Sequence, residues 1–320
     1  MILSVSRRTD IPAFYSDWFY QRIKEGNVCV RNPMNIHQVS RLKLTPDIVD
    51  CIVFWTKNPE PMMKRLDEIE NYSYYFQYTI NDYEKDAEPF VPSLEKRLET
   101  FTRLSEKIGK ERVIWRYDPI FFSDKYTPER HLESFSRIAE RLSNYTEKCV
   151  FSFVDIYPSK NSTNLSRLNV RPLTPAALDS FAGGLSQTAK KYGLTLATCA
   201  EAINLEKHDI KHNSCIDRTL IERITGSALK VGNDGQRENC GCVKCDDIGA
   251  YDTCTHGCTY CYANFRKETV SRKAKLYDIS SPLLCDSIDE LNDKVSDRPL
   301  KSYKTGLPTL EDNFTQLSLF

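Results

Sequence analysis

Short apolar runs alternate with amphipathic stretches along residues 1–200 of the chain. The apolar runs predict six strands, at residues 2–6, 49–55, 74–80, 112–117, 149–154 and 194–198. The amphipathic stretches predict helices at residues 15–25, 61–69, 93–108, 128–142 and 175–192. Six β/α units in succession predict a mostly parallel sheet with right-handed crossovers.

Polar and ionisable side chains follow every one of the predicted strands. In chain order they include Arg7, Arg8, Asp10, Lys57, Asn58, Asn81, Arg116, Asp118, Asp155 and Glu201. An α/β barrel collects such residues on one ring-shaped face, whereas an open sheet collects them at a switch point. No G-x-G-x-x-G follows the first strand to mark a dinucleotide-binding switch point. The pattern therefore predicts a partial TIM-like (β/α)6 barrel.

Composition is that of a globular protein. The chain has 320 residues, of which 40% are hydrophobic, enough for one large core or two smaller ones. Its 44 basic residues equal its 44 acidic ones, so any polyanion site has to be local. Residues 1–5 are too short an apolar run for a signal peptide, and no stretch approaches the roughly 20 apolar residues of a membrane span. We therefore expect a cytoplasmic protein that is not bound to a membrane.

The twelve cysteines crowd toward the C-terminal third of the chain. In a reducing compartment this favours metal ligation over disulfides. Cys254, Cys258 and Cys261 form a C-x3-C-x2-C run. Three closely spaced thiolates hold three irons of a 4Fe-4S cluster and leave the fourth iron open. Residues 1–235 are thus the predicted barrel-like domain, residues 236–265 a cysteine-rich iron-sulfur segment, and residues 266–320 a polar tail, flexible over 301–313.

The cysteine run, with the aromatic Tyr260 before its third cysteine, resembles the signature of radical S-adenosylmethionine (SAM) enzymes. The resemblance implies that the open iron binds SAM, with Tyr260 and Asn58 beside the cofactor. One electron from the cluster then cleaves SAM to a 5'-deoxyadenosyl radical. The resemblance also implies an electron donor such as flavodoxin or ferredoxin, and a six-unit partial barrel as the core.

Two features depart from ordinary radical SAM enzymes. Their cysteine loop follows the first strand, whereas here it follows the sixth predicted strand. No Gly-Gly-Glu follows the second strand to bind the amino group of SAM, and the Gly183-Gly184 pair lies inside a predicted helix. Both departures bear on SAM binding rather than on cluster binding.

The whole chain also resembles a bacterial family of unknown function. The shared segments are residues 6–12 (SRRTDIP), 53–59 (VFWTKNP) and 115–120 (WRYDPI), beside the C-terminal cysteines. The cysteine loop itself is similar to that of spore photoproduct lyase, a radical SAM enzyme that repairs thymine dimers. That second resemblance covers the loop alone, so it implies a class of chemistry and no substrate.

Two other arrangements of the cysteines compete with a single cluster. In the first, a second four-thiolate cluster binds Cys199, Cys215, Cys240 and Cys242, and relays electrons or shields the radical site. In the second, the Cys242/Cys245 and Cys258/Cys261 pairs form a zinc ribbon, or Cys240, Cys242 and Cys245 bind zinc with a partner such as His256 while Cys199 and Cys215 are free thiols. Six cysteines lie between residues 240 and 261, and this surplus over the four of a zinc ribbon favours clusters.

The charged residues at the strand ends are candidates for catalysis. The candidates are Arg8, Asp10, Lys57, Arg116, Asp118, Asp155 and Glu201. Guanidinium and ammonium groups bind carboxylates or phosphates, and carboxylates hold hydroxyls or amines or move a proton. In the alternative, Arg116 and Asp118, or Arg8 and Asp10, pair with each other at the barrel rim.

The chain ends in Gln316, Leu317, Ser318, Leu319 and Phe320. This pentapeptide resembles the QL[S/D]LF motif with which DNA polymerases and repair enzymes bind the bacterial sliding clamp. The apolar residues of such a motif occupy a groove, and the glutamine forms directed hydrogen bonds. In the alternative, the tail folds back onto the barrel.

These observations predict a radical SAM enzyme that acts on nucleic acid, in DNA repair or modification, and is recruited by the sliding clamp. One alternative is a radical SAM enzyme for a small molecule or a peptide. The other is a non-enzymatic iron-sulfur or zinc module that binds a partner or transfers electrons.

Overall fold

A single sheet of eight parallel strands organises the computed structural model, which describes residues 1–158, 160–234 and 240–308. Its strands, in spatial order, are β10 (Asp246–Asp247), β1 (Ile2–Val5), β4 (Cys51–Thr56), β5 (Tyr74–Thr79), β6 (Val113–Ile120), β7 (Lys148–Phe153), β8 (Thr195–Cys199) and β9 (Lys211–Asn213). All six predicted strands are present, and the α/β class with a large parallel sheet is confirmed.

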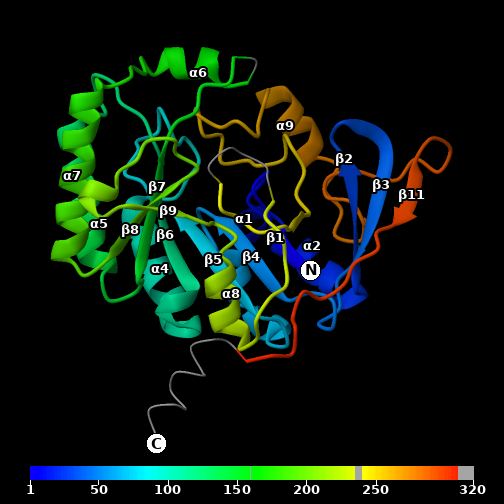
Figure 1. Cartoon of the computed structure of the whole chain (residues 1–320). Coiled ribbons are helices and arrows are strands. Elements are labelled where there is room, and N and C mark those ends of the chain that lie inside the picture. Colours follow the sequence, from blue (N-terminus) through cyan, green and yellow to red (C-terminus); the bar gives the residue numbers. More distant parts are fainter. Residues whose placement is uncertain (159, 235–239, 309–320) are drawn as a thin grey trace, which may run out of the picture.

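Four long helices cover one face of this sheet, in the positions that the amphipathic stretches predict. They are α2 (Ser16–Glu25), α4 (Leu94–Ile108), α5 (Pro128–Leu142) and α7 (Pro175–Lys191). Figure 1 shows α4, α5 and α7 along one side of the sheet, and Phe101 and Phe135 pack there against Tyr78 and Trp115. Thr127 caps α5 by accepting a hydrogen bond from the Arg130 N–H.

Shorter elements connect these helices and strands. They are α1 (Ile11–Phe14), α3 (Glu60–Met63), α6 (Ser162–Arg167), and the 3-10 turns η1 (Leu66–Ile69), η2 (Lys110–Arg112) and η3 (Glu206–His208). The single helix predicted over residues 61–69 is therefore two pieces, α3 and η1. None of the helices in the described residues is long and apolar enough to cross a membrane.

In the part of the chain that the structure describes, the large sheet does not close into a barrel, so of the predicted partial barrel the parallel α/β sheet is what the structure confirms. Within the described residues, the edge strands β9 and β10 do not pair with each other, so the sheet is open. A closed barrel would bury the inner face of these strands. Here that face is covered by helix α8 (Arg218–Thr225) and by apolar residues on either side of it, Cys215, Ile216, Leu229, Val231, Cys242 and Val243. Val53 and Tyr75 of the sheet share one apolar cluster with Ile216 and Ile221 of this covering segment.

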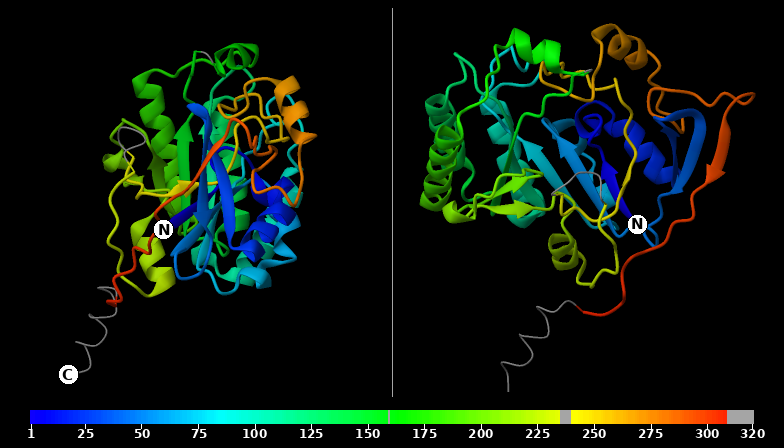
Figure 2. Two further views of the ribbon diagram at one scale, coloured as in Figure 1. Left: turned by 90° about the vertical axis from the view of Figure 1, so that its right-hand side faces the viewer. Right: turned by 45° about the horizontal axis from the view of Figure 1, so that its top comes forward.

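A small second sheet lies beside the large one. Strands β2 (Asn27–Asn32) and β3 (Asn35–Lys43) form a hairpin, and β11 (Lys294–Asp297) pairs in parallel with β3. Figure 2 shows this sheet next to helix α9 (Lys267–Ala274). The described part of the predicted polar tail is therefore partly ordered. Arg31 of β2 forms ion pairs with Asp286 and Asp293 and so anchors this segment to the second sheet. A hydropathy pattern cannot predict ion pairs between residues so far apart in the chain.

Strand β10 lies beside β1, although the two strands are about 240 residues apart in the chain. It pairs in parallel with β1, with Leu3 opposite Asp246 and Ser4 opposite Asp247. The Asp247 carboxylate accepts hydrogen bonds from Ser4 Oγ at 2.8 Å, Ser6 Oγ at 2.6 Å and the Arg7 N–H at 2.9 Å. The cysteine loop follows β10, so it lies at the carboxyl edge of the sheet.

Candidate iron-sulfur and substrate site

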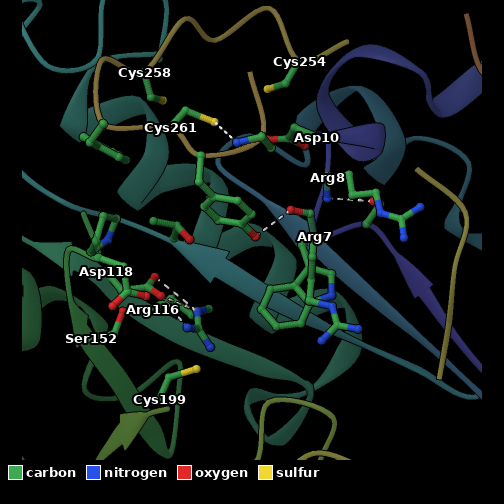
Figure 3. Close-up of a pocket in the computed structure, with 18 of the residues that line it drawn as sticks. Arg7, Arg8, Asp10, Arg116, Asp118, Ser152, Cys199, Cys254, Cys258 and Cys261 are labelled. Atoms are coloured by element: carbon green, nitrogen blue, oxygen red, sulfur yellow. Dashed lines mark hydrogen bonds and ion pairs between the residues drawn. The ribbon is translucent and has the colours of Figure 1, made fainter. Parts of the chain in front are cut away.

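The carboxyl ends of the strands surround a cavity of about 580 Å³ (Figure 3). Its lining includes Arg7, Arg8, Asp10, Lys57, Thr79, Arg116, Asp118, Asp155 and Cys199, which come from the ends of β1 and β4 to β8. Parallel strands end at one edge, which is why residues so far apart in the chain meet here. A volume of this size falls within the range of about 300–1,000 Å³ typical of small-molecule sites.

Two of the candidate residues do not line this cavity. Glu201 Oε1 accepts a hydrogen bond from the Phe153 N–H at 2.8 Å and so links the ends of β7 and β8. Asn58 Oδ1 accepts from the Glu60 N–H at 3.4 Å, at the start of α3. The other six candidates for catalysis and Tyr260 do line it.

The three cysteines of the loop lie together on one side of the cavity (Figure 3). Backbone hydrogen bonds fix the loop: the Thr259 N–H donates to Ala87 O at 2.9 Å, and the Ala263 N–H donates to Cys261 Sγ at 3.3 Å. Gly257 has a φ of +67°, and a Cβ there would lie 3.0 Å from the Phe90 ring. Glycine therefore allows the turn between the first two thiols.

Burial keeps these thiols neutral when no metal is bound. Burial, together with the nearby Asp10 and Cys261, raises the pKa of Cys254 to about 12. Burial also raises the pKa of Cys258, against the opposing effect of the Lys57 ammonium. A metal centre displaces the protons of such thiols and turns them into thiolates. These residues therefore fit a site in which the cysteines are neutral without metal and negatively charged with it.

A buried ion network supports the loop from behind. The Glu88 carboxylate accepts from Lys57 Nζ at 2.7 Å, from Arg97 at 3.5 Å, and from the Tyr260 hydroxyl. Burial alone would raise the pKa of Glu88, but the two cations outweigh it and the pKa is below its ordinary value. Tyr260 is thus held by Glu88, and Lys57 carries a positive charge next to Cys258.

Asp10 joins three parts of the site. Its carboxylate accepts from the Ala13 N–H at 3.0 Å, from the Lys57 N–H at 2.7 Å, and contacts His256 Nε2 at 2.8 Å. These bonds tie the end of β1 to the end of β4 and to the cysteine loop. Asp10 therefore positions the loop, and His256 is its partner within the loop.

The strand-end arginines are paired with acidic residues. Arg116 Nε lies 3.1 Å from both carboxylate oxygens of Asp118, which is the pairing that the sequence allowed as an alternative. Arg8 pairs with Asp247 at 4.0 Å rather than with Asp10. Arg7 donates to the Cys245 thiol at 3.2 Å.

Four further thiols line the same cavity. Cys199 Sγ and Cys215 Sγ are 2.9 Å apart, and the Cys242 thiol is hydrogen-bonded to those of Cys215 and Cys240. Figure 3 shows Cys199 on the side of the pocket away from the loop cysteines. Among the described residues, no group of three or more metal-binding side chains is gathered as around a bound ion.

Aromatic and basic side chains form another part of the lining. Lys160 Nζ lies 5.6 Å from the ring centre of Tyr157 and 5.9 Å from that of Tyr251. The Arg8 guanidinium lies 5.2 Å from the ring centre of Tyr251, and the Tyr157 and Tyr262 rings are 6.1 Å apart. All five side chains are half-buried, so each keeps a surface that faces solvent.

Comparison with known families gives a match over most of the chain. The model of a family described as a domain of unknown function, DUF1848, matches residues 2–263. The chain belongs to the DUF1848 family. The DUF1848 match contains all eight strands of the large sheet and the seven cysteines of both sets, and it ends before α9.

Other comparisons add little to the DUF1848 assignment. No curated protein matches the chain. One similar solved structure is that of a Bacteroides thetaiotaomicron protein assigned as an alpha-L-fucosidase, with 12% identity over 55% of this chain and 71% of that chain, at a TM-score of 0.25. A likeness of this size supports no conclusion about this member of the DUF1848 family.

Two residues of the site carry little signal in the sequence. Glu88 lies in a loop after β5, far from any motif, and becomes important only because Tyr260 of the cysteine loop and Lys57 donate hydrogen bonds to it. Asp247 belongs to a strand of two residues, too short to give a period. The Asp-Ile-Gly at residues 247–249 is a weak sign of it, because a Cβ on Gly249 would lie 2.0 Å from Ser6 Oγ.

Proposed function

We propose that this chain is a radical SAM-type iron-sulfur enzyme in which Cys254, Cys258 and Cys261 hold three irons of a 4Fe-4S cluster. The observation that carries the proposal is the meeting of these three thiols at one side of a cavity at the carboxyl edge of a parallel sheet. When bound there, the cluster and SAM supply a 5'-deoxyadenosyl radical that takes a hydrogen atom from a substrate.

The strand order supports this proposal. In radical SAM enzymes the cysteine loop follows the first strand of the core. Here it follows β10, which lies outside β1 at the edge of the sheet and runs parallel to it. If β10 is counted as the first strand, the strands from β1 to β9 follow in chain order across the sheet to its other edge. This is the order expected after a circular permutation that moves the first strand to a later position in the chain. The late position of the cysteines in the sequence is then compatible with an ordinary partial-barrel core.

The residues of the chain have defined tasks in this proposal. Lys57 offsets the negative charge that a cluster brings to Cys258, and Glu88 holds both Lys57 and Tyr260 in place. Asp10 and His256 fix the loop to the strand ends. The remaining polar residues bind SAM and substrate and keep water away from them, with Arg116 and Asp118 already paired.

The lining of the cavity favours a nucleic-acid substrate. Single bases stack on aromatic rings, and cations beside them bind the phosphates. Tyr157, Tyr251 and Tyr262 provide such rings here, and Arg8 and Lys160 provide the cations. Since the net charge of the chain is zero, this local arrangement is what supports binding of a polyanion.

The test is the electron paramagnetic resonance spectrum of anaerobically purified, dithionite-reduced protein with and without SAM. We expect a reduced 4Fe-4S signal that changes when SAM is added, because SAM would bind the open iron. The Cys258→Ala protein, reduced and measured in the same way, is the control and is expected to give no change with SAM. A signal that ignores SAM, or zinc in place of iron, would contradict the proposal and favour a metal-stabilised binding or electron-transfer module.

Recruitment to DNA by the sliding clamp is a separate prediction from the sequence. Its residues 316–320 lie outside the described part of the chain. Deletion of these five residues is expected to abolish binding of the full chain to immobilised bacterial clamp, because the apolar anchors are lost. A variant with the same five residues in reversed order is the matched control and is also expected not to bind. Unchanged clamp binding after the deletion would favour the small-molecule or peptide substrate.

A further inference from the structure

The second set of thiols has the surroundings of metal-bound thiolates. Cys242 Sγ lies 3.2 Å from the Cys215 N–H and 3.3 Å from the Ile216 N–H, both of which donate to it. Cys215 Sγ accepts from Asn213 Nδ2 at 3.6 Å. N–H donors of this kind stabilise thiolate sulfur and tune the centre that the sulfur binds.

A buried positive charge faces the same sulfurs. Arg116 Nη1 donates to Cys215 Sγ at 2.8 Å, and its guanidinium lies 5.2 Å from the ring centre of Trp55. Asp118 neutralises only one side of this guanidinium. The indole N–H of Trp55 is buried and has no partner among the described residues. One cation and one spare donor thus lie beside four thiols that together would carry four negative charges.

We propose that Cys199, Cys215, Cys240 and Cys242 bind a second, closed four-thiolate 4Fe-4S cluster, and that Arg116 is the positioning residue that offsets its charge. All four thiols line the cavity, so this cluster lies at the wall of the proposed substrate site. Cys245 is excluded, because it does not line the cavity. The site uses none of the three loop cysteines.

The first experiment counts metal in variants that separate the two sites. The chain is purified anaerobically after expression with iron-sulfur assembly proteins, and iron, acid-labile sulfide and zinc are measured. We expect about eight irons per wild-type chain and about four in a Cys254→Ala, Cys258→Ala, Cys261→Ala variant, with a reduced signal that ignores SAM.

A complementary variant removes ligands of the second site. Cys215→Ser with Cys242→Ser is expected to keep about four irons and the signal that changes with SAM. Cys245→Ser is the matched control and is expected to keep all the iron. The single Cys240→Ser change, at a half-buried position, replaces the double variant if that one does not fold. The proposal fails if the triple loop variant holds zinc or no iron, or if the second-site variants keep the full iron content.

The role of Arg116 is tested by a redox titration of the triple loop variant, in which only the second cluster remains. Arg116→Gln is expected to lower its midpoint potential, because the cation stabilises the more negative, reduced cluster. Arg116→Lys keeps the charge and is expected to restore part of the shift. Equal potentials in all three proteins would show that Arg116 does not act on the cluster. A wild-type chain that holds about eight irons but does not respond to SAM would count against the first site and not against the second cluster.

Discussion

Removal of one sulfur atom, in Cys258→Ala, is expected to abolish reductive cleavage of SAM. Cys258 is the central thiol of the loop, and the charge of Lys57 acts on it. Its loss leaves two thiols for a cluster that needs three. The product to measure is 5'-deoxyadenosine, formed anaerobically with dithionite and SAM. We expect its rate to fall to that of buffer without protein.

The control for this variant is Cys149→Ala. Cys149 is a fully buried thiol of β7 that does not line the cavity, so this change removes the same atom from the core without touching the site. It is expected to keep the cleavage rate. Cleavage by Cys258→Ala at the wild-type rate would reject the loop as the cluster site, and a wild-type chain that holds the cluster without cleaving SAM would point to electron transfer.

Replacement of Glu88 by alanine is expected to lower the free energy of unfolding by about 3–5 kcal/mol, the usual cost of removing one partner from a buried ion pair. Its side chain is 1% exposed, and it is the shared partner of Lys57 and Arg97, which the variant leaves buried beside each other. Urea unfolding followed by circular dichroism measures the change.

Glu84→Ala is the matched control for Glu88→Ala. Glu84 pairs with Lys125 and Arg130 at an exposed position, so its loss is expected to cost less than about 1 kcal/mol.

The pH dependence of stability gives a second check on Glu88. Because the pKa of Glu88 is lowered in the folded state, its contribution is present at neutral pH and is lost as the pH falls below the ordinary value of 4.5. The difference in stability between the wild type and Glu88→Gln should therefore shrink in acid.

The strands of the large sheet were predictable because they are buried on both faces. Residues 74–78, with Tyr and Phe at four of five positions, form a strand in which every side chain is buried. Spacing and number singled out the two cysteine sets, and all seven of these thiols line the cavity, while their metal binding stays a prediction. The covering of the inner face was not predictable, because it depends on Ile216 and Ile221, whose contacts with Val53 and Tyr75 join distant parts of the chain. Asp247 and Glu88 likewise act through partners that no local pattern identifies.

The pairing of β10 with β1 sets an order of events during synthesis of the protein. Ser4 leaves the ribosome 243 residues before Asp247, its partner across the two strands. Until then the edge of β1 is unpaired, and an unpaired parallel edge favours association with other chains. The loop cysteines follow Asp247 in the sequence, so the proposed cluster can be loaded only after β10 has been synthesised. Loading of the proposed cluster would therefore come after every strand of the large sheet has left the ribosome.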